Sequence, residues 1–255
     1  MKLSPQQLGF FEKLAIDDSS PRTVQLFDWS GRDPIDFNDG WNFQKELMSN
    51  HLNRLKEDQV DASQQQEREH GQYGGFDSVV MLQHSPVFTL GTGSSPDFVL
   101  SDLVPVVRMD RGGEVTYHGP GQLVVYPVID LRGYKQDIHW YMRALEETIL
   151  LAMKKAGIQN AVREDNVTGV WIDGRKVAAL GIKARRWITQ HGLAINVTPE
   201  SLENFHGIVP CGLEGREVTC VNDHLVRPIS VMDFAGFMRE ALEEVFCVYM
   251  VTAES

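Results

Sequence analysis

The chain is poor in cysteine, in long apolar runs and in positive charge. Its three cysteines in 255 residues stand at positions 211, 220 and 247, and this small odd number does not suggest a disulfide framework. No apolar run approaches the roughly 20 residues that cross a membrane. The formal net charge of -11 has the wrong sign for general nucleic-acid binding, which needs a basic face. We therefore expect reduced thiols, no membrane insertion and no nucleic-acid partner.

The N-terminal segment MKLSPQQLGFFEKLAIDDSS lacks the apolar core of a secretory signal peptide. It carries Glu12, Asp17 and Asp18, which are atypical of an arginine-rich transit peptide. We therefore expect a cytoplasmic protein. The alternative is a mitochondrion or plastid, reached with a targeting segment that was removed ahead of Met1.

The size and composition are those of an ordinary globular protein. A hydrophobic content of 42% and a charged content of 23% in 28.8 kDa allow one large domain or two small ones. No repeat of 20 to 50 residues is visible, which excludes solenoids and propellers. We expect a single domain over residues 1–255. The polar stretch at about 56–75 is predicted to be an exposed, partly disordered insertion or, alternatively, a frayed helix end.

Helices are predicted where apolar residues recur on one face. The first begins at Asn38, with Asn38 or Asp39 as its cap, and presents one apolar face: Trp41, Met48, Leu52 and Leu55. The second covers residues 139–158 and stops at Gly157, with another such face: Tyr141, Leu145, Ile149, Ala152 and Ala156. A third covers 230–250, with Ser230 and Asp233 as a capping box and Cys247 buried near its end.

Short β-like runs occupy the rest of the chain, at 78–83, 123–129, 170–172, 177–182 and 193–197. The pair Asp173-Gly174 between two apolar runs is the strongest local hairpin signal. Strands, hairpins and flanking helices together predict an α/β or α+β fold, with a mixed central β-sheet flanked by helices.

Three segments hold the chemically unusual residues: RGGEVTYHGPGQ at 111–122, GRKVAALGIKARR at 174–186 and IVPCGL at 208–213. The dense glycines of the first indicate a tight loop or a surface where backbone approaches a ligand closely. Cys211, between Pro210 and Gly212, stands at a break in regular structure, where a thiol can serve as a nucleophile rather than as core filler.

A thiol nucleophile must be activated, because a free thiol at neutral pH is mostly protonated. The candidate activators are His84, His118, His191 and the cations of 174–186, among which Lys176 opens an apolar strand directly after a turn. The spacing of Cys211 to Cys220 and His224 matches no common zinc site, so no metal is expected.

These three segments, together with HSPVFTLG at 84–91, resemble the lipoyl(octanoyl) transferase family over about residues 78–213. The resemblance implies an acyltransferase that moves an octanoyl chain from acyl carrier protein to a lysine of a lipoyl domain. The chain would pass through a cysteine-bound thioester, in the first step of endogenous lipoate synthesis. The implied fold is similar to the catalytic domain of biotin and lipoate protein ligases.

The same resemblance implies roles for particular residues. Cys211 would carry the acyl thioester, and Lys176 would lower the pKa of that cysteine. A substrate wall would be formed by Arg111, Gly112, Gly113, Glu114, Val115, Thr116, Tyr117, His118, Ala179, Leu180, Gly181, Gly192, Leu193 and Ala194. The implied partners are octanoyl-acyl carrier protein and the lipoyl domains of 2-oxoacid dehydrogenase complexes and of the glycine cleavage protein. No cofactor is implied.

Two other functions stay open at this point. An ATP-dependent lipoate or biotin protein ligase could share the fold, although the GRGRRG-like adenylation signature is absent. A non-enzymatic structural or regulatory protein would leave Cys211, Lys176 and the glycines unexplained. Five cations lie within the twelve residues 175–186, which hold no acid. They form either a solvated strand end or a docking site for an acidic carrier: Arg175, Lys176, Lys183, Arg185 and Arg186.

Overall fold

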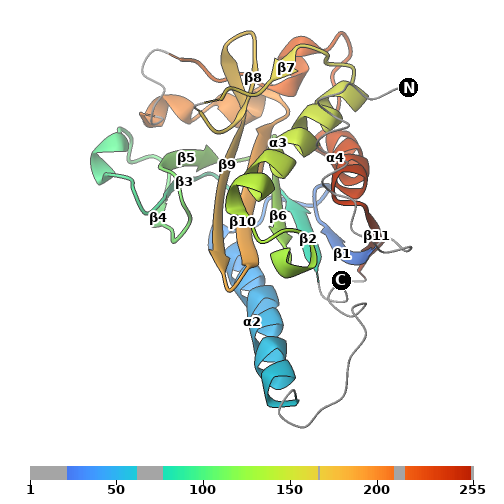
Figure 1. The fold of residues 1–255 in the computed structure, drawn as a ribbon. Coiled ribbons are helices and arrows are strands. Elements are labelled where there is room, and N and C mark those ends of the chain that lie inside the picture. The colour runs from blue at the N-terminus through green and yellow to red at the C-terminus, as the bar shows by residue number, and fades with distance from the viewer. Residues whose placement is uncertain (1–21, 62–76, 166, 210–215, 254–255) are drawn as a thin grey trace.

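The structure, a computed structural model, describes residues 22–61, 77–165, 167–209 and 216–253. Within these ranges, eight strands form one mixed sheet in the order β11-β1-β2-β6-β10-β9-β8-β7, and three form a smaller sheet in the order β4-β3-β5 (Figure 1). The strands of the large sheet are β1 Arg22–Asp28, β2 Ser78–Leu82, β6 Gln122–Val128, β7 Ala161–Val162, β8 Val170–Ile172, β9 Arg175–Arg185, β10 Ile188–Asn196 and β11 Val248–Thr252. Those of the small sheet are β3 Val87–Leu90, β4 Val106–Arg108 and β5 Val115–His118.

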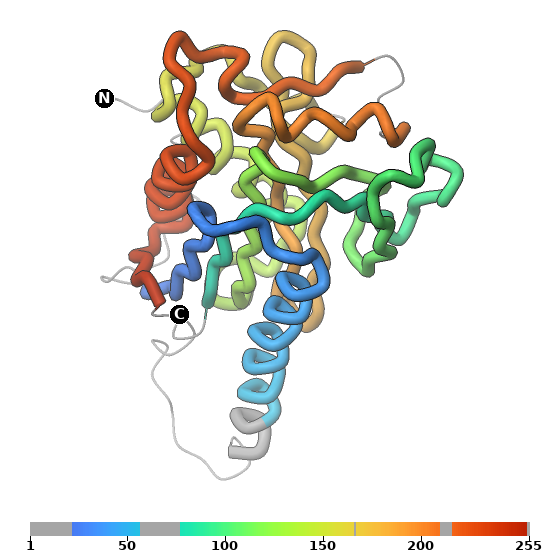
Figure 2. The backbone as a smooth tube through the Cα atoms, turned by 180° about the vertical axis from the view of Figure 1, so that it is seen from behind, coloured from blue at the N-terminus to red at the C-terminus, as the bar shows by residue number. Residues whose placement is uncertain are grey.

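The helices cover both faces of the large sheet, which confirms the predicted mixed sheet flanked by helices. Helices α3 (Ile138–Lys155) and α4 (Val231–Phe246) pack together over one face, while α2 (Phe37–Asp61) crosses the other (Figures 1 and 2). The alternation of side chains along β2 and β6 divides the core accordingly. Met81 and Val125 belong to the cluster under α3 and α4, whereas Leu82 and Val124 belong to the cluster on the side of α2.

Helix α2 begins one residue before the predicted start. The Asp36 carboxylate accepts a hydrogen bond from the Asn38 N–H at 2.8 Å, so Asp36 caps the helix and the predicted caps Asn38 and Asp39 are wrong. Met48 and Leu55 are buried, as their spacing predicts. The helix continues to Asp61, so the first six residues of the 56–75 stretch are helical. Residues 62–75 lie outside the described part of the chain.

The predicted signals of α3 and α4 are confirmed, with one error at Cys247. Gly157 ends α3 with a φ of 103°, and Ser230 and Asp233 form a capping box at the start of α4. Helix α4 stops at Phe246, and Cys247 follows in the left-handed conformation with a φ of 52°. Cys247 is exposed rather than buried, because the chain reverses there into β11. The segment after it pairs with β1 in parallel instead of continuing the helix.

Two hairpins organise the middle of the sheet. The Asp173-Gly174 turn joins β8 to β9 with φ values of 51° and 76°, as the sequence predicts. A second turn at Arg186 and Trp187 joins β9 to β10 with φ values of 53° and 69°, and no glycine announces it. Strands β1, β3, β4, β5, β7 and β11 were not predicted. None of the helices in the described ranges is long and apolar enough to cross a membrane.

The five cations predicted to form one cluster lie apart. They occur along and just beyond β9, which spans Arg175–Arg185. At about 3.3 Å per residue, the nine steps from Lys176 to Arg185 separate the two backbones by roughly 30 Å. Lys176 faces a cavity, whereas Arg185 is exposed at the far end of the strand beside α2. A single docking patch made of all five residues is therefore wrong.

Candidate active site

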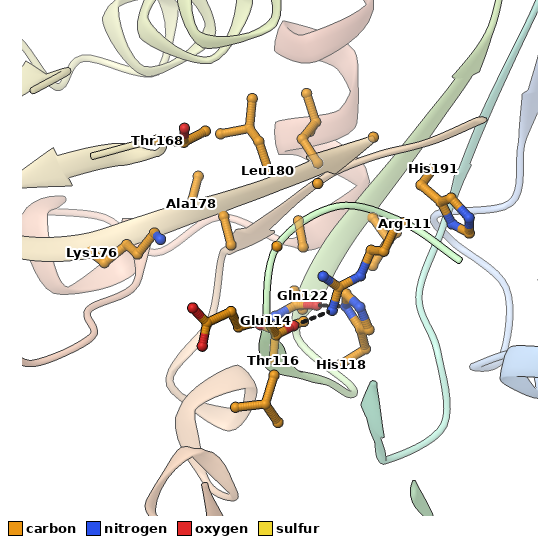
Figure 3. A pocket seen from close by; sticks show the side chains of 18 of the residues that line it. Arg111, Glu114, Thr116, His118, Gln122, Thr168, Lys176, Ala178, Leu180 and His191 are labelled. Carbon is orange, nitrogen blue, oxygen red and sulfur yellow. Dashed lines mark hydrogen bonds between the residues drawn. The ribbon is translucent and has the colours of Figure 1, made fainter. Parts of the chain in front are cut away.

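A cavity of about 370 Å³ lies where the small sheet meets strands β6, β9 and β10 of the large sheet (Figure 3). This volume is in the range of small-molecule sites. Its lining brings together most of the predicted site residues: Arg111, Gly113, Glu114, Val115, Thr116, His118, Lys176, Ala179, Leu180, Gly181, Gly192, Leu193 and Ala194. It also contains residues that the sequence did not indicate: Phe37, Met109, Gln122, Val124, Tyr126, Val167, Thr168, Ala178, Asn196, Phe205 and Val218.

Two residues of the predicted wall do not line the cavity. The Tyr117 ring points to the opposite face of β5, where it packs against Phe88 and Phe205 and accepts a hydrogen bond from Asn204 at 3.0 Å. Gly112 is used through its backbone, whose N–H donates to the Ile182 carbonyl oxygen at 2.9 Å. The glycine loop is thereby joined to β9.

Glycine is required where backbone segments come closest beside the cavity. A Cβ atom at Gly192 would lie 2.1 Å from the Val125 carbonyl oxygen, and one at Gly181 would lie 3.0 Å from the Gly112 carbonyl oxygen. Gly181 and Gly192 are also direct neighbours in the β9–β10 register. The glycines at 181 and 192 therefore permit close approach of protein backbone to protein backbone. That the glycine-rich segment 111–122 borders a ligand stays a prediction.

Arg111 holds the glycine loop from within. Its guanidinium donates to the Thr89 carbonyl and hydroxyl oxygens at 3.1 and 2.8 Å and to the Glu114 carbonyl oxygen at 2.9 Å. Burial lowers the pKa of Arg111 to about 10, which still leaves it charged at neutral pH. Its bonds to the backbone fix the loop that carries the first part of the predicted wall.

A chain of hydrogen bonds sets the protonation of His118. Asn196 Nδ2 donates to the Thr219 carbonyl oxygen at 3.1 Å, so its Oδ1 accepts from Gln122 Nε2 at 3.0 Å. Gln122 Nε2 also donates to the Tyr117 carbonyl oxygen, which turns Gln122 Oε1 toward His118 Nδ1 at 2.7 Å. Because an amide oxygen only accepts, Nδ1 carries the proton. Nε2 of the neutral ring is then an acceptor, and no hydrogen bond among the described residues reaches it.

Burial, followed by the nearby His84, lowers the pKa of His118 to about 3. The imidazole is therefore neutral at physiological pH and a weak base. His84 does not line the cavity. It is buried with Nδ1 at 3.0 Å from the Ile35 carbonyl oxygen and Nε2 at 2.7 Å from the Tyr126 hydroxyl. Because its ring does not reach the cavity, His84 cannot activate a thiol there directly.

His191, the fourth residue of β10, also lines the cavity (Figure 3). Its Nε2 lies 3.0 Å from Asp110 Oδ1, and Asp110 also pairs with Lys183. Burial lowers the pKa of His191 to about 4 although Asp110 acts in the opposite direction. His191 is therefore a second neutral imidazole rather than a cation that could stabilise a thiolate.

Lys176 is the second residue of β9 and points its amine into the cavity (Figure 3). Its backbone N–H donates to the Glu217 carbonyl oxygen at 2.9 Å, and its carbonyl oxygen accepts from the Thr219 N–H at 2.9 Å. Burial lowers the pKa of the Lys176 amine to about 8, while the carboxylate of Glu146 raises it. A lysine with this pKa can gain and lose a proton near neutral pH.

Cys211 belongs to residues 210–215 and lies outside the described part of the chain. The described residues on either side reach the cavity, since Phe205 and Val218 both line it. Cys220 is fully buried, and burial raises the pKa of its thiol to about 11, so it is protonated at neutral pH. In the described ranges no three histidine, cysteine, aspartate or glutamate side chains are grouped so as to hold a metal ion.

The fold is that of a lipoate protein ligase catalytic domain. A crystal structure of lipoate-protein ligase A bound with ATP superposes with a TM-score of 0.64 at 14% identity, covering 92% of this chain and 88% of that chain. A lipoate protein ligase from T. acidophilum gives a TM-score of 0.62 at 16% identity over 92% of this chain and 88% of that one. At these identities the likeness establishes the fold alone.

Sequence comparison defines the family. The lipoyl protein ligase A/B catalytic domain matches residues 37–243. A chloroplastic octanoyltransferase of Arabidopsis thaliana is 42% identical over 207 residues, which cover 80% of this chain and 68% of the relative. An octanoyltransferase of Prochlorococcus marinus is 42% identical over 242 residues, 92% of this chain and 93% of the relative. The chain belongs to the lipoyl protein ligase A/B catalytic domain family.

Proposed function

We propose that this protein is an octanoyltransferase, which moves an octanoyl chain from acyl carrier protein to a lysine of a lipoyl domain. The observation that carries the proposal is the cavity itself. It combines an apolar row on three adjacent strands, made of Val124, Ala194 and Ala179, with the amine of Lys176. An apolar slot suits a hydrocarbon chain, and an amine of pKa about 8 suits proton transfer at the thioester. Relatives at 42% identity bear the name octanoyltransferase.

In the first half-reaction, the thiolate of Cys211 attacks the carbonyl carbon of the octanoyl thioester on the carrier. The bond from that carbon to the carrier sulfur breaks, and the chain is left on Cys211. Lys176 takes the proton from the Cys211 thiol and gives it to the departing carrier sulfur. Atoms and charges balance without another reactant.

In the second half-reaction, the neutral amine of the acceptor lysine attacks the acyl-cysteine. An amide bond forms, the bond to the Cys211 sulfur breaks, and Lys176 accepts the proton that the attacking nitrogen must lose. The backbone N–H of Gly113, which lines the cavity, is a candidate to donate to the carbonyl oxygen while it carries negative charge. This electrostatic role is part of the proposal.

The proposed partners are those that the family resemblance implies. The donor is octanoyl-acyl carrier protein, and the acceptors are the lipoyl domains of 2-oxoacid dehydrogenase complexes and of the glycine cleavage protein. One catalytic domain serves both. The proposed setting is the cytoplasm or, as for the chloroplastic relative, a plastid.

The competing function is an ATP-dependent ligase, because a ligase of the same fold has been solved with ATP bound. A ligase activates a free carboxylic acid with ATP, whereas a thioester is already activated. The deciding experiment supplies the purified protein with octanoyl-carrier and a lipoyl domain, with and without ATP, and follows the masses of both proteins. Octanoylation of the lipoyl domain without ATP, through an enzyme adduct on Cys211, is expected. Transfer that needs free octanoate and ATP would refute the proposal.

A further inference from the structure

A buried carboxylate stands behind the cavity wall, on helix α3. Glu146 is 1% exposed, and both of its oxygens are bound. Oε1 accepts a hydrogen bond from the Gly169 N–H at 3.1 Å, and Oε2 accepts from Arg143 Nη1 at 2.7 Å. Carboxylates are seldom buried so completely, because losing water is costly even when the charge is paired. The proposed reaction steps leave this group without a role.

Gly169 connects Glu146 to the cavity. Its φ of 140° lies in a region that favours glycine, and its backbone forms the surface on which the Lys176 side chain lies. A Cβ atom at Gly169 would be 2.6 Å from Lys176 Cε, 3.3 Å from Lys176 Nζ and 2.9 Å from the Ala178 carbonyl oxygen. The hydrogen bond from Gly169 to Glu146 therefore fixes the peptide that supports the lysine stem.

The other charged groups near Lys176 are already paired. The Arg216 guanidinium lies over the Trp171 ring, 4.5 Å from its centroid, and is bound to the Glu164 carboxylate at 2.8 Å. The Lys176 amine is 5.4 Å from the same centroid. Within the described residues, no carboxylate is within ion-pair distance of Lys176. Glu146, one peptide away, is the acidic group that acts on it most strongly.

Resting on the proposed function, we infer that Glu146 is a positioning residue for Lys176 and acts through Gly169. It holds the Gly169 peptide in place beneath the lysine stem. Its negative charge also offsets part of the cost of burying the ammonium. Without that charge the amine would lose its proton more readily, and without the hydrogen bond its place in the cavity would no longer be defined.

The test measures Lys176 directly, without substrate. The purified protein is treated briefly with acetic anhydride across a range of pH, and the extent of acetylation at Lys176 is read by peptide mass spectrometry. In Glu146→Gln the side chain can still accept from the Gly169 N–H but has no charge. The pKa of Lys176 is expected to fall, which raises its labelling rate at pH 7 by several-fold and up to about tenfold.

Glu147→Gln is the matched control. It removes the same charge from the next residue of α3, whose carboxylate is bound to Arg163 at 3.0 Å instead of to Gly169. The Lys176 titration is expected to be unchanged in that variant. Equal titrations in wild type, Glu146→Gln and Glu147→Gln would overturn the inference, as would equal shifts in the two variants.

Gly169→Ala provides a second variant in case Glu146→Gln folds poorly. The added methyl group displaces the Lys176 stem, so the pKa of the amine is expected to return toward the ordinary value of 10.5. An unchanged titration in a folded Gly169→Ala protein would also contradict the inference. Failure of octanoyl transfer with the labelling shifts intact would refute the proposed function and leave the role of Glu146 standing.

Discussion

Replacing Lys176 with arginine separates two roles that a lysine beside a nucleophile can fill. A positive charge alone stabilises a thiolate, and arginine supplies that charge nearly as well. A base must also lose its proton, which arginine does not do in proteins. Lys176→Arg is therefore expected to form some acyl-enzyme, because the carrier sulfur can leave as a thiolate and take its proton from water, but to fail in passing the chain to the lipoyl domain.

The pKa of Lys176 sets the size of the effect. With a pKa of about 8 rather than the ordinary 10.5, roughly a tenth of the amine is neutral at pH 7, against about three parts in ten thousand otherwise. Loss of a general base slows a reaction by about 10²- to 10⁴-fold. We expect transfer by Lys176→Arg to fall by at least about 100-fold at pH 7. In the wild type, transfer should fall as the pH drops below about 8, because a protonated Lys176 cannot accept a proton.

The assay resolves the two half-reactions by rapid quenching and intact-mass measurement of enzyme and lipoyl domain. Lys176→Met is the control, because it keeps an unbranched stem over Gly169 and removes both charge and base. It should be slow in both half-reactions. Transfer to the lipoyl domain by Lys176→Arg at the wild-type rate would show that Lys176 acts through its charge alone.

Three further substitutions and one control variant test the site and the strands that support it. Cys211→Ser should abolish octanoyl transfer. The control Cys247→Ser, at an exposed thiol, should keep it. An active Cys211→Ser enzyme would refute the assignment of Cys211 as the nucleophile. His118→Asn retains an N–H near the position of Nδ1 but removes the Nε2 acceptor. The Tm should therefore stay unchanged while the KM for octanoyl-carrier rises several-fold. An unchanged KM would show that Nε2 contacts no substrate. Gly192→Ala puts a methyl group 2.1 Å from the Val125 carbonyl oxygen. It should lower the free energy of unfolding, measured by denaturant titration, by about 1–3 kcal/mol. Unaltered stability would mean that strands β6 and β10 can move apart without cost.

Local signals in the sequence correctly predicted a turn, a helix cap and a helix end. The Asp173-Gly174 turn, the capping box of Ser230 with Asp233 and the stop at Gly157 all depend on residues a few positions apart. The alternation within β5 also carried a signal for Tyr117, since Thr116 and His118 share a face that Tyr117 cannot share. Treating residues 111–118 as one continuous wall ignored that alternation.

Local signals in the sequence could not predict contacts between distant segments. Gln122 meets Asn196 across 74 positions, and Gly169 meets Glu146 across 23. Neither pair has a spacing that indicates contact before the sheet order is known. The reversal at Cys247 has the same origin, because parallel pairing with β1 outweighs the apolar run that predicted a longer helix. The roles of Cys211 and Lys176 came from family resemblance, and they stay predictions.

Burial acts in the same direction on every nitrogen base of the cavity, yet its consequences differ. It lowers the pKa of His118 from 6.5 to about 3 and that of His191 to about 4, far below the pH of a cell. The pKa of Lys176 starts at 10.5, and the same effect brings it to about 8. Exchange of a proton is most effective when the pKa of the group lies near the working pH. In this cavity the imidazoles are therefore suited to accepting or donating hydrogen bonds, and the lysine is suited to carrying the proton between the two half-reactions.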